Sequence, residues 1–252
     1  MNIRPVVQDY DNYTPGDLAV WQLLFDRQMA LLQQYASNDY LQALGQIGFN
    51  AVTIPDFKET NARLGKLTGW QLIVAPGLVP PEKFFGLLAQ KIFPATCWLR
   101  TMEQLDYLEE PDMFHDVFGH VPLLGNKAYA AFMESFGKLA LKWREEPEAL
   151  QILSRIYWFT IEFGLLEEQD KVKLFGAGIL SSTGESCHAL SDTPQKKEFN
   201  LEEVMTENYR TDVLQEKFYI IHSFEQLCAT LPAIEKHIER HIATKVPIKA
   251  FL

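Results

Sequence analysis

The chain has 252 residues, of which 47% are hydrophobic and 12% aromatic, so it is long enough to bury one substantial core. Its 33 acidic and 23 basic side chains give a net charge of −10, and the sequence contains no basic cluster. This balance argues against a nucleic acid or an anionic membrane as a partner. No apolar run approaches membrane-spanning length, and the three cysteines form no CxxC pair. We therefore expect a single cytoplasmic domain over residues 1–252.

The first quarter of the chain is predicted to be helical. Thr14, Pro15 and Asp17 form a capping box, and the apolar residues that follow recur at helical spacing. A helix with one buried face should therefore begin here. Two further helices are predicted over residues 39–44 and 57–67.

The segment 70–80 has a different pattern. Its apolar and β-branched residues are interrupted by Pro76, Gly77 and Pro80, which predicts a short strand followed by an ordered loop. A helix restarts behind Pro80 and Pro81, and residues 95–101 fit either a strand or a turn.

Helical patterns return over residues 110–143, and a break is expected around Gly119, Pro122 and Gly125. Residues 147–166 have the length of a helix. The stretch RIYWFTIEF inside them nevertheless has strong β-propensity, and periodicity does not choose between the two.

The glycines of residues 173–185 predict a hairpin or a tight turn, and a last helix is predicted over residues 222–242 with an interruption at Pro232. The sequence contains no internal repeat and no linker. The predicted fold class is therefore mainly α, with packed helices and a few short strands in one domain.

Two histidines, His115 and His120, lie five positions apart in the stretch PDMFHDVFGH. In a regular α-helix, residues at this spacing are separated by about 140° around the axis, so they would not share one face. The break expected at Gly119 and Pro122 would allow both to bind one metal ion. Because buried and capping histidines are common, the spacing alone leaves a structural role open.

The other histidines carry weaker signals. His237 and His241 are four positions apart, but their charged surroundings favour the solvated face of an amphipathic helix. His188 and His222 have no neighbouring ligand pattern, so we expect both to be structural.

A third metal ligand would have to come from elsewhere, and Glu162 is the single carboxylate in the apolar and aromatic segment IYWFTIEFG. A buried carboxylate needs a cation or a hydrogen-bond partner, so metal ligation and a salt bridge with Arg155 are both open. Two imidazoles and one carboxylate on one face of an ion are typical of non-haem Fe(II) oxygenases, although these ligand types also allow zinc.

Three long motifs together resemble the pterin-dependent aromatic amino acid hydroxylases, and most closely the bacterial phenylalanine 4-hydroxylases. They occur in the family's order and approximate spacing as PDMFHDVFGHVPLL, RIYWFTIEFGL and FGAGILSSTGE. The resemblance extends over most of the chain through YTPGDLAVW, LTGWQLIVAPGLVP and NYRTD. It implies a mainly α catalytic domain with an iron site in a central cleft.

The resemblance implies a role for each matching position at the iron and the substrate. The implied iron ligands are His115, His120 and Glu162, with Tyr157 near the iron. The implied substrate contacts are Arg100 for the carboxylate, Ser181 for the polar end of the amino acid, and Trp158 and Pro111 around the ring.

The implied pterin contacts lie on another part of the chain. They are Gly77 and Val79 in the loop 75–79, Phe84 stacked on the pterin ring, and Asp116, whose short carboxylate would reach the pterin through water. Glu185 matches a family carboxylate that supports the residues around the site.

Some positions depart from the family pattern. Leu108 stands in the approximate place of a substrate-side threonine, and Pro81 replaces a pterin-side serine, so contacts there differ from those of the animal relatives. The resemblance also covers neither an N-terminal regulatory domain nor a C-terminal tetramerisation tail. We therefore expect an unregulated monomer.

The expected activity is hydroxylation of L-phenylalanine to L-tyrosine with O₂ and a tetrahydropterin at a non-haem Fe(II) centre. Trp158 and Thr211 favour phenylalanine over tyrosine or tryptophan, but such a pocket discriminates by only about 1 to 3 kcal/mol, so tryptophan is the alternative substrate. Two further alternatives are a zinc hydrolase with Asp116 as its base and a non-catalytic amino acid binding protein.

Overall fold

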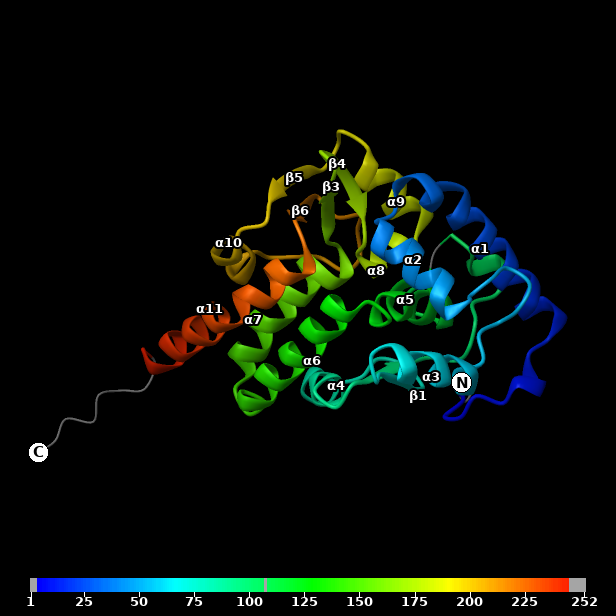
Figure 1. Ribbon diagram of the computed structural model, residues 1–252, viewed down its shortest axis with the longest axis horizontal. Coiled ribbons are helices and arrows are strands. Elements are labelled where there is room, and N and C mark those ends of the chain that lie inside the picture. The colour runs from blue at the N-terminus through cyan, green and yellow to red at the C-terminus, as the bar shows by residue number, and fades with distance from the viewer. Residues whose placement is uncertain (1–3, 107, 245–252) are drawn as a thin grey trace, which may run out of the picture.

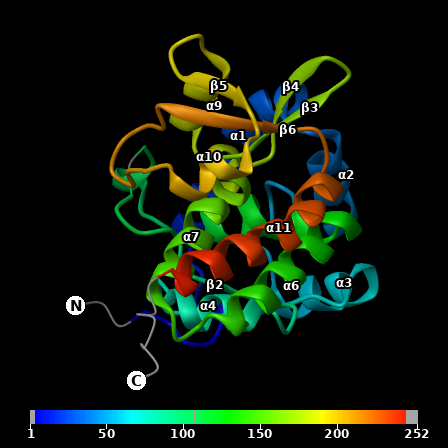
Figure 2. The ribbon, with the colours of Figure 1, turned by 90° about the vertical axis from the view of Figure 1, so that its left-hand side faces the viewer.

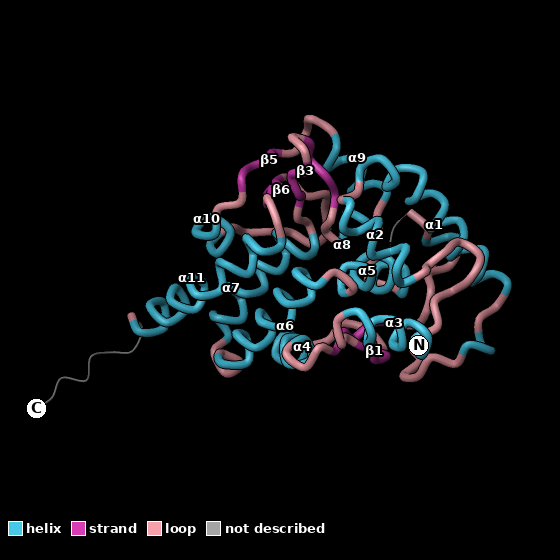
Figure 3. The backbone as a smooth tube through the Cα atoms, viewed as in Figure 1, coloured by secondary structure: helices cyan, strands magenta, loops and turns pink. Residues whose placement is uncertain are grey.

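The structure is a computed structural model that describes residues 4–106 and 108–244. Helices dominate it, as predicted, and the strands are short (Figures 1 and 3). The α-helices are α1 Pro15–Tyr35, α2 Asn38–Ile47, α3 Phe57–Leu67, α4 Pro81–Leu88, α5 Val121–Leu124, α6 Lys127–Lys142, α7 Pro147–Tyr157, α8 Ala177–Leu180, α9 Thr183–Leu190, α10 Leu201–Thr206 and α11 Phe224–Ala243. Two π-helical segments cover Phe114–His120 and Trp158–Glu162, and two 3₁₀ turns cover Tyr10–Asn12 and Met102–Gln104.

The strands form two separate small sheets. Strands β1 Gln71–Val74 and β2 Ile92–Ala95 pair in parallel around α4. The second sheet has the order β4-β3-β6-β5, built from β3 Leu165–Glu168, β4 Lys171–Leu174, β5 Gln195–Glu198 and β6 Lys217–Ile221. In Figure 1 the larger sheet lies at the top and β1 of the smaller sheet at the bottom, with helices between them. The predicted strand in 70–80 is confirmed, whereas strands β2 to β6 were not predicted with these bounds.

Local signals in the sequence explain where several helices begin. The capping box of α1 is present, because the Thr14 side chain accepts the Asp17 N–H and the Asp17 side chain accepts the Thr14 N–H. Helix α3 has the predicted bounds and begins after the Asp56 cap. Helix α6 begins after Asn126, whose side chain accepts two backbone N–H groups.

Helix α6 packs against α4, α7 and α11, and these helices lie below the larger sheet in Figure 2, with α4 next to β2 of the smaller sheet. Helix α6 lies between α4 and α11, and Gly137 permits its close approach to α4, since a Cβ there would lie 2.4 Å from the Ala89 nitrogen. The buried residues form one continuous apolar cluster, rich in aromatic rings, that connects these helices to α1 and α2.

The structure differs from the predictions at the hairpin of residues 173–185 and at Pro232. The hairpin joins β3 to β4 through Gln169 and Asp170, both with positive φ, whereas the glycines of residues 173–185 lead into α8 and α9. Helix α11 continues through Pro232, which is exposed, because buried residues on both sides of it hold the helix against the core. The hairpin was therefore predicted at the wrong position, and the predicted interruption at Pro232 is absent.

No helix in the described parts of the chain has both the length and the apolar character needed to cross a membrane.

Candidate metal centre and active site

The two histidines of the opening motif lie in the π-helical segment Phe114–His120. A π-helix bonds residue i to i+5, so residues five apart lie one turn apart and His115 and His120 share a face. Their Nε2 atoms are 3.3 Å apart and their ring planes are nearly perpendicular, at 83°. The spacing that is unfavourable in an α-helix therefore brings the two imidazoles together.

The break predicted at Gly119 and Pro122 is absent, since α5 follows directly at Val121, whereas the break predicted at Gly125 is present between α5 and α6. Gly119 serves a different purpose, because a Cβ there would lie 2.9 Å from the Ala177 carbonyl oxygen of α8. Within the same segment, the Phe118 carbonyl accepts the hydroxyl of the buried Tyr40 at 2.9 Å.

Glu162 ends the second π-helical segment and faces both histidines. Its Oε1 lies 3.1 Å from His120 Nε2 and its Oε2 lies 3.6 Å from His115 Nε2. One ligand atom from each residue lies within 4.8 Å of the other two. The alternative pairing with Arg155 is wrong, because the Arg155 guanidinium instead donates to the Met205 carbonyl.

The donor set fits an Fe(II) ion. His115 Nδ1 lies 2.9 Å from Ser181 Oγ, and because that hydroxyl donates to the Ala177 carbonyl, it accepts the Nδ1 proton and leaves His115 Nε2 free as a ligand. Burial lowers the pKa of His115, which keeps its imidazole neutral. Burial alone would raise the pKa of Glu162, but His120 and His115 outweigh it and lower that pKa. The Nε2 atoms of His115 and His120 and the Glu162 carboxylate are therefore placed to bind one cation.

Gly176 holds the backbone of Glu162 in place. A Cβ at this position would lie 2.5 Å from the Glu162 carbonyl oxygen and 2.7 Å from the Gly164 nitrogen, and neither backbone atom can move freely. We expect Gly176→Ala to lower the free energy of unfolding by about 1 to 3 kcal/mol and to weaken Fe(II) binding. Urea unfolding and Fe(II) titration would measure both effects.

The exposed Gly65 in α3 is the matched control, because no atom lies within 4 Å of a Cβ built there. Gly65→Ala should stabilise the protein by about 0.5 to 1 kcal/mol. Equal effects of the two substitutions would contradict the role given to Gly176.

Arg100 is linked to the histidine segment by Asp112, a residue that the sequence analysis missed. The guanidinium donates from Nε and Nη2 to the two Asp112 oxygens at 2.9 and 2.8 Å, and Asp112 is fully buried. Asp112 Oδ1 also accepts the His115 N–H at 3.2 Å. A carboxylate three residues before His115, in the apolar run PDMF, was the available signal.

Tyr157 lies next to His120, and Phe84 lies next to Tyr157. The Tyr157 ring is 6.3 Å from the His120 ring and 5.3 Å from the Phe84 ring, which meets it edge-on. The Tyr157 hydroxyl is buried and has no hydrogen-bond partner among the described residues. Asp116 points to Thr96, whose N–H it accepts at 2.7 Å, and burial raises the Asp116 pKa.

The remaining predicted residues surround this group. Trp158 belongs to the same π-helical segment as Glu162, and Pro111 directly precedes Asp112. Gly77 and Val79 lie in the loop between β1 and α4, both partly buried. The N-terminal segment borders this loop, since a Cβ at Gly77 would lie 3.1 Å from Arg4 Nη1.

The sequence matches a known protein family over nearly its whole length. Residues 6–247 match the family model of biopterin-dependent aromatic amino acid hydroxylases. The chain belongs to this family. It is 45% identical to the phenylalanine-4-hydroxylase of Ralstonia nicotianae over 87% of this chain and 70% of that protein, and 43% identical to that of Chromobacterium violaceum over 89% and 76%.

A solved structure of the family gives the same fold. The crystal structure of the C. violaceum phenylalanine hydroxylase with bound iron(III) and 7,8-dihydrobiopterin superposes with a TM-score of 0.88 at 40% identity. The match covers 96% of this chain and 87% of that one. The family resemblance and the mainly α fold class are therefore confirmed.

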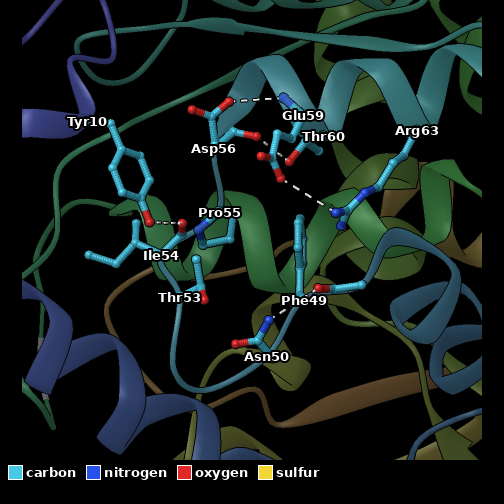
Figure 4. A pocket seen from close by; sticks show the side chains of 11 residues that line it. Tyr10, Phe49, Asn50, Thr53, Ile54, Pro55, Asp56, Glu59, Thr60 and Arg63 are labelled. Atoms are coloured by element: carbon cyan, nitrogen blue, oxygen red, sulfur yellow. Dashed lines mark hydrogen bonds and ion pairs between the residues drawn. The ribbon is translucent and has the colours of Figure 1, made fainter.

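A separate pocket of about 530 Å³ lies beside α3 and contains none of the residues predicted for this hydroxylase-family site (Figure 4). Its polar groups are paired with one another: Tyr10 donates to the Ile54 carbonyl at 2.8 Å, Asp56 accepts the Glu59 N–H at 2.9 Å, and Glu59 lies 3.5 Å from Arg63. The charged side chains among its lining residues, Asp56, Glu59 and Arg63, therefore all have partners within the protein.

Glu185, the supporting carboxylate implied by the hydroxylase resemblance, is buried on α9. Its Oε1 accepts the Gln215 N–H at 3.1 Å, and its Oε2 has no hydrogen-bond partner within the described residues. Burial raises the Glu185 pKa from 4.5 to about 7, although the Gln215 N–H opposes the shift.

This raised pKa makes the stability depend on pH. Between pH 4.5 and about 7 the unfolded chain loses the Glu185 proton while the folded protein keeps it, so stability falls as pH rises through this window. Glu185→Gln has no such proton and serves as the reference. Relative to this variant, the free energy of unfolding of the wild type should fall by about 3 kcal/mol between pH 4.5 and 8. Urea unfolding of both proteins across this range would measure it. Parallel stability profiles would contradict the assignment.

Proposed function

We propose that this protein hydroxylates L-phenylalanine to L-tyrosine with O₂ and a tetrahydropterin at a non-haem Fe(II) centre. The observation that carries the proposal is the cluster of His115, His120 and Glu162 on two π-helical segments, in a chain of the biopterin-dependent family. Phenylalanine is supported as the substrate by the bacterial relatives at 45% and 43% identity, both named phenylalanine-4-hydroxylase.

In this proposal His115, His120 and Glu162 hold the iron through two Nε2 atoms and a carboxylate. Bound iron and reduced pterin would together supply the activation of O₂, with one oxygen atom passing to the aromatic ring and the other to the pterin. Ser181 fixes the tautomer of His115 by accepting its Nδ1 proton, as second hydrogen bonds to metal-binding histidines commonly do. All three side chains lie on helical backbone, in the two π-helical segments.

Arg100 would bind the substrate carboxylate. Three of its five N–H groups donate to Asp112 and to the Leu105 carbonyl, which leaves one hydrogen on each terminal nitrogen for a bidentate contact. Ser181 would contact the same polar end. Trp158 and Pro111 would enclose the ring.

On the pterin side, Phe84 would stack on the bicyclic ring, and Gly77 and Val79 would contact it from their loop. Asp116 would reach the pterin through water, since one of its oxygens already accepts the Thr96 N–H. Tyr157 would separate the two sites, because its ring lies between those of Phe84 and His120.

The same scaffold could take tryptophan as its substrate. A non-catalytic amino acid binding protein would keep the Arg100 contact without the chemistry.

We further propose that the described residues act as one catalytic domain, in the cytoplasm and as a monomer. The continuous apolar cluster supports one domain, and three free cysteines fit a reducing compartment. Size-exclusion chromatography with light scattering would test the monomer.

An anaerobic Fe(II) titration of the apoprotein, followed by phenylalanine, tetrahydropterin and air, tests the activity. Tyrosine that forms only with iron and accumulates in proportion to the pterin supplied is the expected result. Iron binding without tyrosine, but with product from tryptophan, would establish the alternative substrate. Iron binding without any product would favour the binding protein, and no iron binding would remove the metal assignment.

A further inference from the structure

The connection between α10 and β6 has one buried anchor. From Arg210 to Glu216 every residue is exposed except Gln215, which is 5% exposed. The Gln215 side-chain amide donates to the Arg210 and Val213 carbonyls at 3.0 and 3.3 Å, so it holds the turn of its own loop. We call residues 207–216 the anchor loop.

The anchor loop touches Trp158 at two points. Gln215 Oε1 accepts the indole N–H at 2.9 Å, and the Tyr209 ring stacks on the indole with centroids 4.5 Å apart and an interplanar angle of 16°. A buried indole N–H without an acceptor is costly, so these contacts favour one orientation of the Trp158 ring. Thr211, the position that the sequence analysis associated with substrate choice, lies in the same loop.

Two side chains of helix α9 contact the backbone of Gln215. Glu185 Oε1 accepts the Gln215 backbone N–H at 3.1 Å, and His188 Nε2 lies 3.0 Å from the Gln215 carbonyl oxygen. Both polar groups of the Gln215 backbone are therefore fixed by side chains of one helix. That helix begins two residues after Ser181, the residue that orients His115.

We infer that Gln215 is a positioning residue for the aromatic wall of the substrate pocket, and that Glu185 keeps it in place. Gln215 acts through Trp158 and does not itself contact the substrate. The inference rests on the proposed function in one respect, namely that Trp158 borders the substrate ring. Its consequence is that affinity and selectivity among aromatic amino acids depend on the hydrogen bond from the Trp158 indole to Gln215.

Gln215→Met tests the inference, because methionine has a similar length but cannot accept the indole proton or hold the Arg210 and Val213 carbonyls. We expect KM for phenylalanine to rise about 3- to 10-fold, the equivalent of one lost hydrogen bond, and kcat to change less than 2-fold. The ratio of kcat/KM for phenylalanine over tryptophan should fall by a similar factor. The control is Glu216→Gln, an exposed neighbour in the same loop, which should change neither constant.

A double-mutant cycle with Trp158→Phe separates positioning from general loosening. The side chain introduced by Trp158→Phe has no indole N–H. Gln215→Met should therefore raise KM little further in the Trp158→Phe background. Fully additive effects on KM, or a Gln215→Met protein that matches the control, would overturn the inference. Fe(II) stoichiometry equal to that of the wild type would show that each variant is folded at the metal centre.

The part played by Glu185 has its own pair of variants. Glu185→Gln retains an acceptor for the Gln215 N–H and should keep KM near the wild-type value, whereas Glu185→Leu removes the acceptor and should behave like Gln215→Met. A KM for Glu185→Leu that equals the wild-type value would contradict the role of Glu185.

Hydrogen exchange provides a readout that does not require activity. The backbone amides of residues 207–216 should exchange faster in Glu185→Leu and Gln215→Met than in Glu185→Gln and Glu216→Gln. If the wild type makes no tyrosine, the proposed function fails, but this exchange pattern still tests whether Glu185 and Gln215 hold the loop. Equal exchange in all four variants would overturn the inference independently.

Discussion

Glu162→Ala is expected to lose Fe(II) binding and tyrosine formation together. The carboxylate is the only oxygen donor in the cluster described here and the partner of both histidines, so its loss leaves two imidazoles with an incomplete set of ligands. Changes at residues that merely support a metal ligand cost 10- to 100-fold, so removal of the ligand should lower Fe(II) affinity by more than about 100-fold. Titration with Fe(II) and a tyrosine assay on the same samples would measure both losses.

His115→Ala should behave in the same way, and His241→Ala provides the matched control. His241 also lies near a second histidine and a carboxylate, with its Nε2 2.8 Å from Glu148 Oε2, but on the exposed face of α11. Its replacement should leave iron content and turnover unchanged. Wild-type turnover by an iron-free Glu162→Ala or His115→Ala protein would contradict the ligand assignment.

The cluster of His115, His120 and Glu162 could be predicted from the sequence, but its geometry could not. His115 and His120 would need a break in the helix only with the 3.6-residue period of an α-helix. The chain instead changes its hydrogen-bond period within the helix, and the same happens before Glu162. Periodicity analysis has no signal for a single π-helical turn, because its stability comes from tertiary contacts such as the one between Tyr40 and the Phe118 carbonyl.

The fold shows the same division between local and long-range causes. Helices α1 and α3 carry their own caps and apolar faces, so their starts could be read directly. Strand β5 has the sequence QKKE, without any apolar alternation, and exists because it pairs with the buried strand β6. Asp112 and Gln215 were missed for a similar reason, since each is defined by a distant partner that no local pattern reveals.

The second large effect is expected at the buried pair of Arg100 and Asp112, whose side chains are 10% and 0% exposed. Arg100→Lys keeps the charge but loses the planar fork that holds Asp112 on one side and, as proposed, the substrate carboxylate on the other. KM for phenylalanine should rise by about 10- to 100-fold, since hydrogen bonds to charged groups contribute roughly 1.5 to 3 kcal/mol. Steady-state kinetics would measure it, with Fe(II) content as the check that the metal centre is intact.

Asp112→Ala should be more damaging to stability, because it leaves the Arg100 charge buried without its partner and removes the acceptor of the His115 N–H. We expect a loss of about 3 to 5 kcal/mol in the free energy of unfolding. The exposed pair of Arg210 and Asp212 has the same two-bond geometry, at 3.0 and 2.7 Å, and is the matched control. Asp212→Ala should cost less than about 1 kcal/mol, because water replaces the lost partner. Similar losses at the two pairs would show that burial does not set the strength of the Arg100 contact, and the substrate role built on that rigid contact would then lose its physical basis.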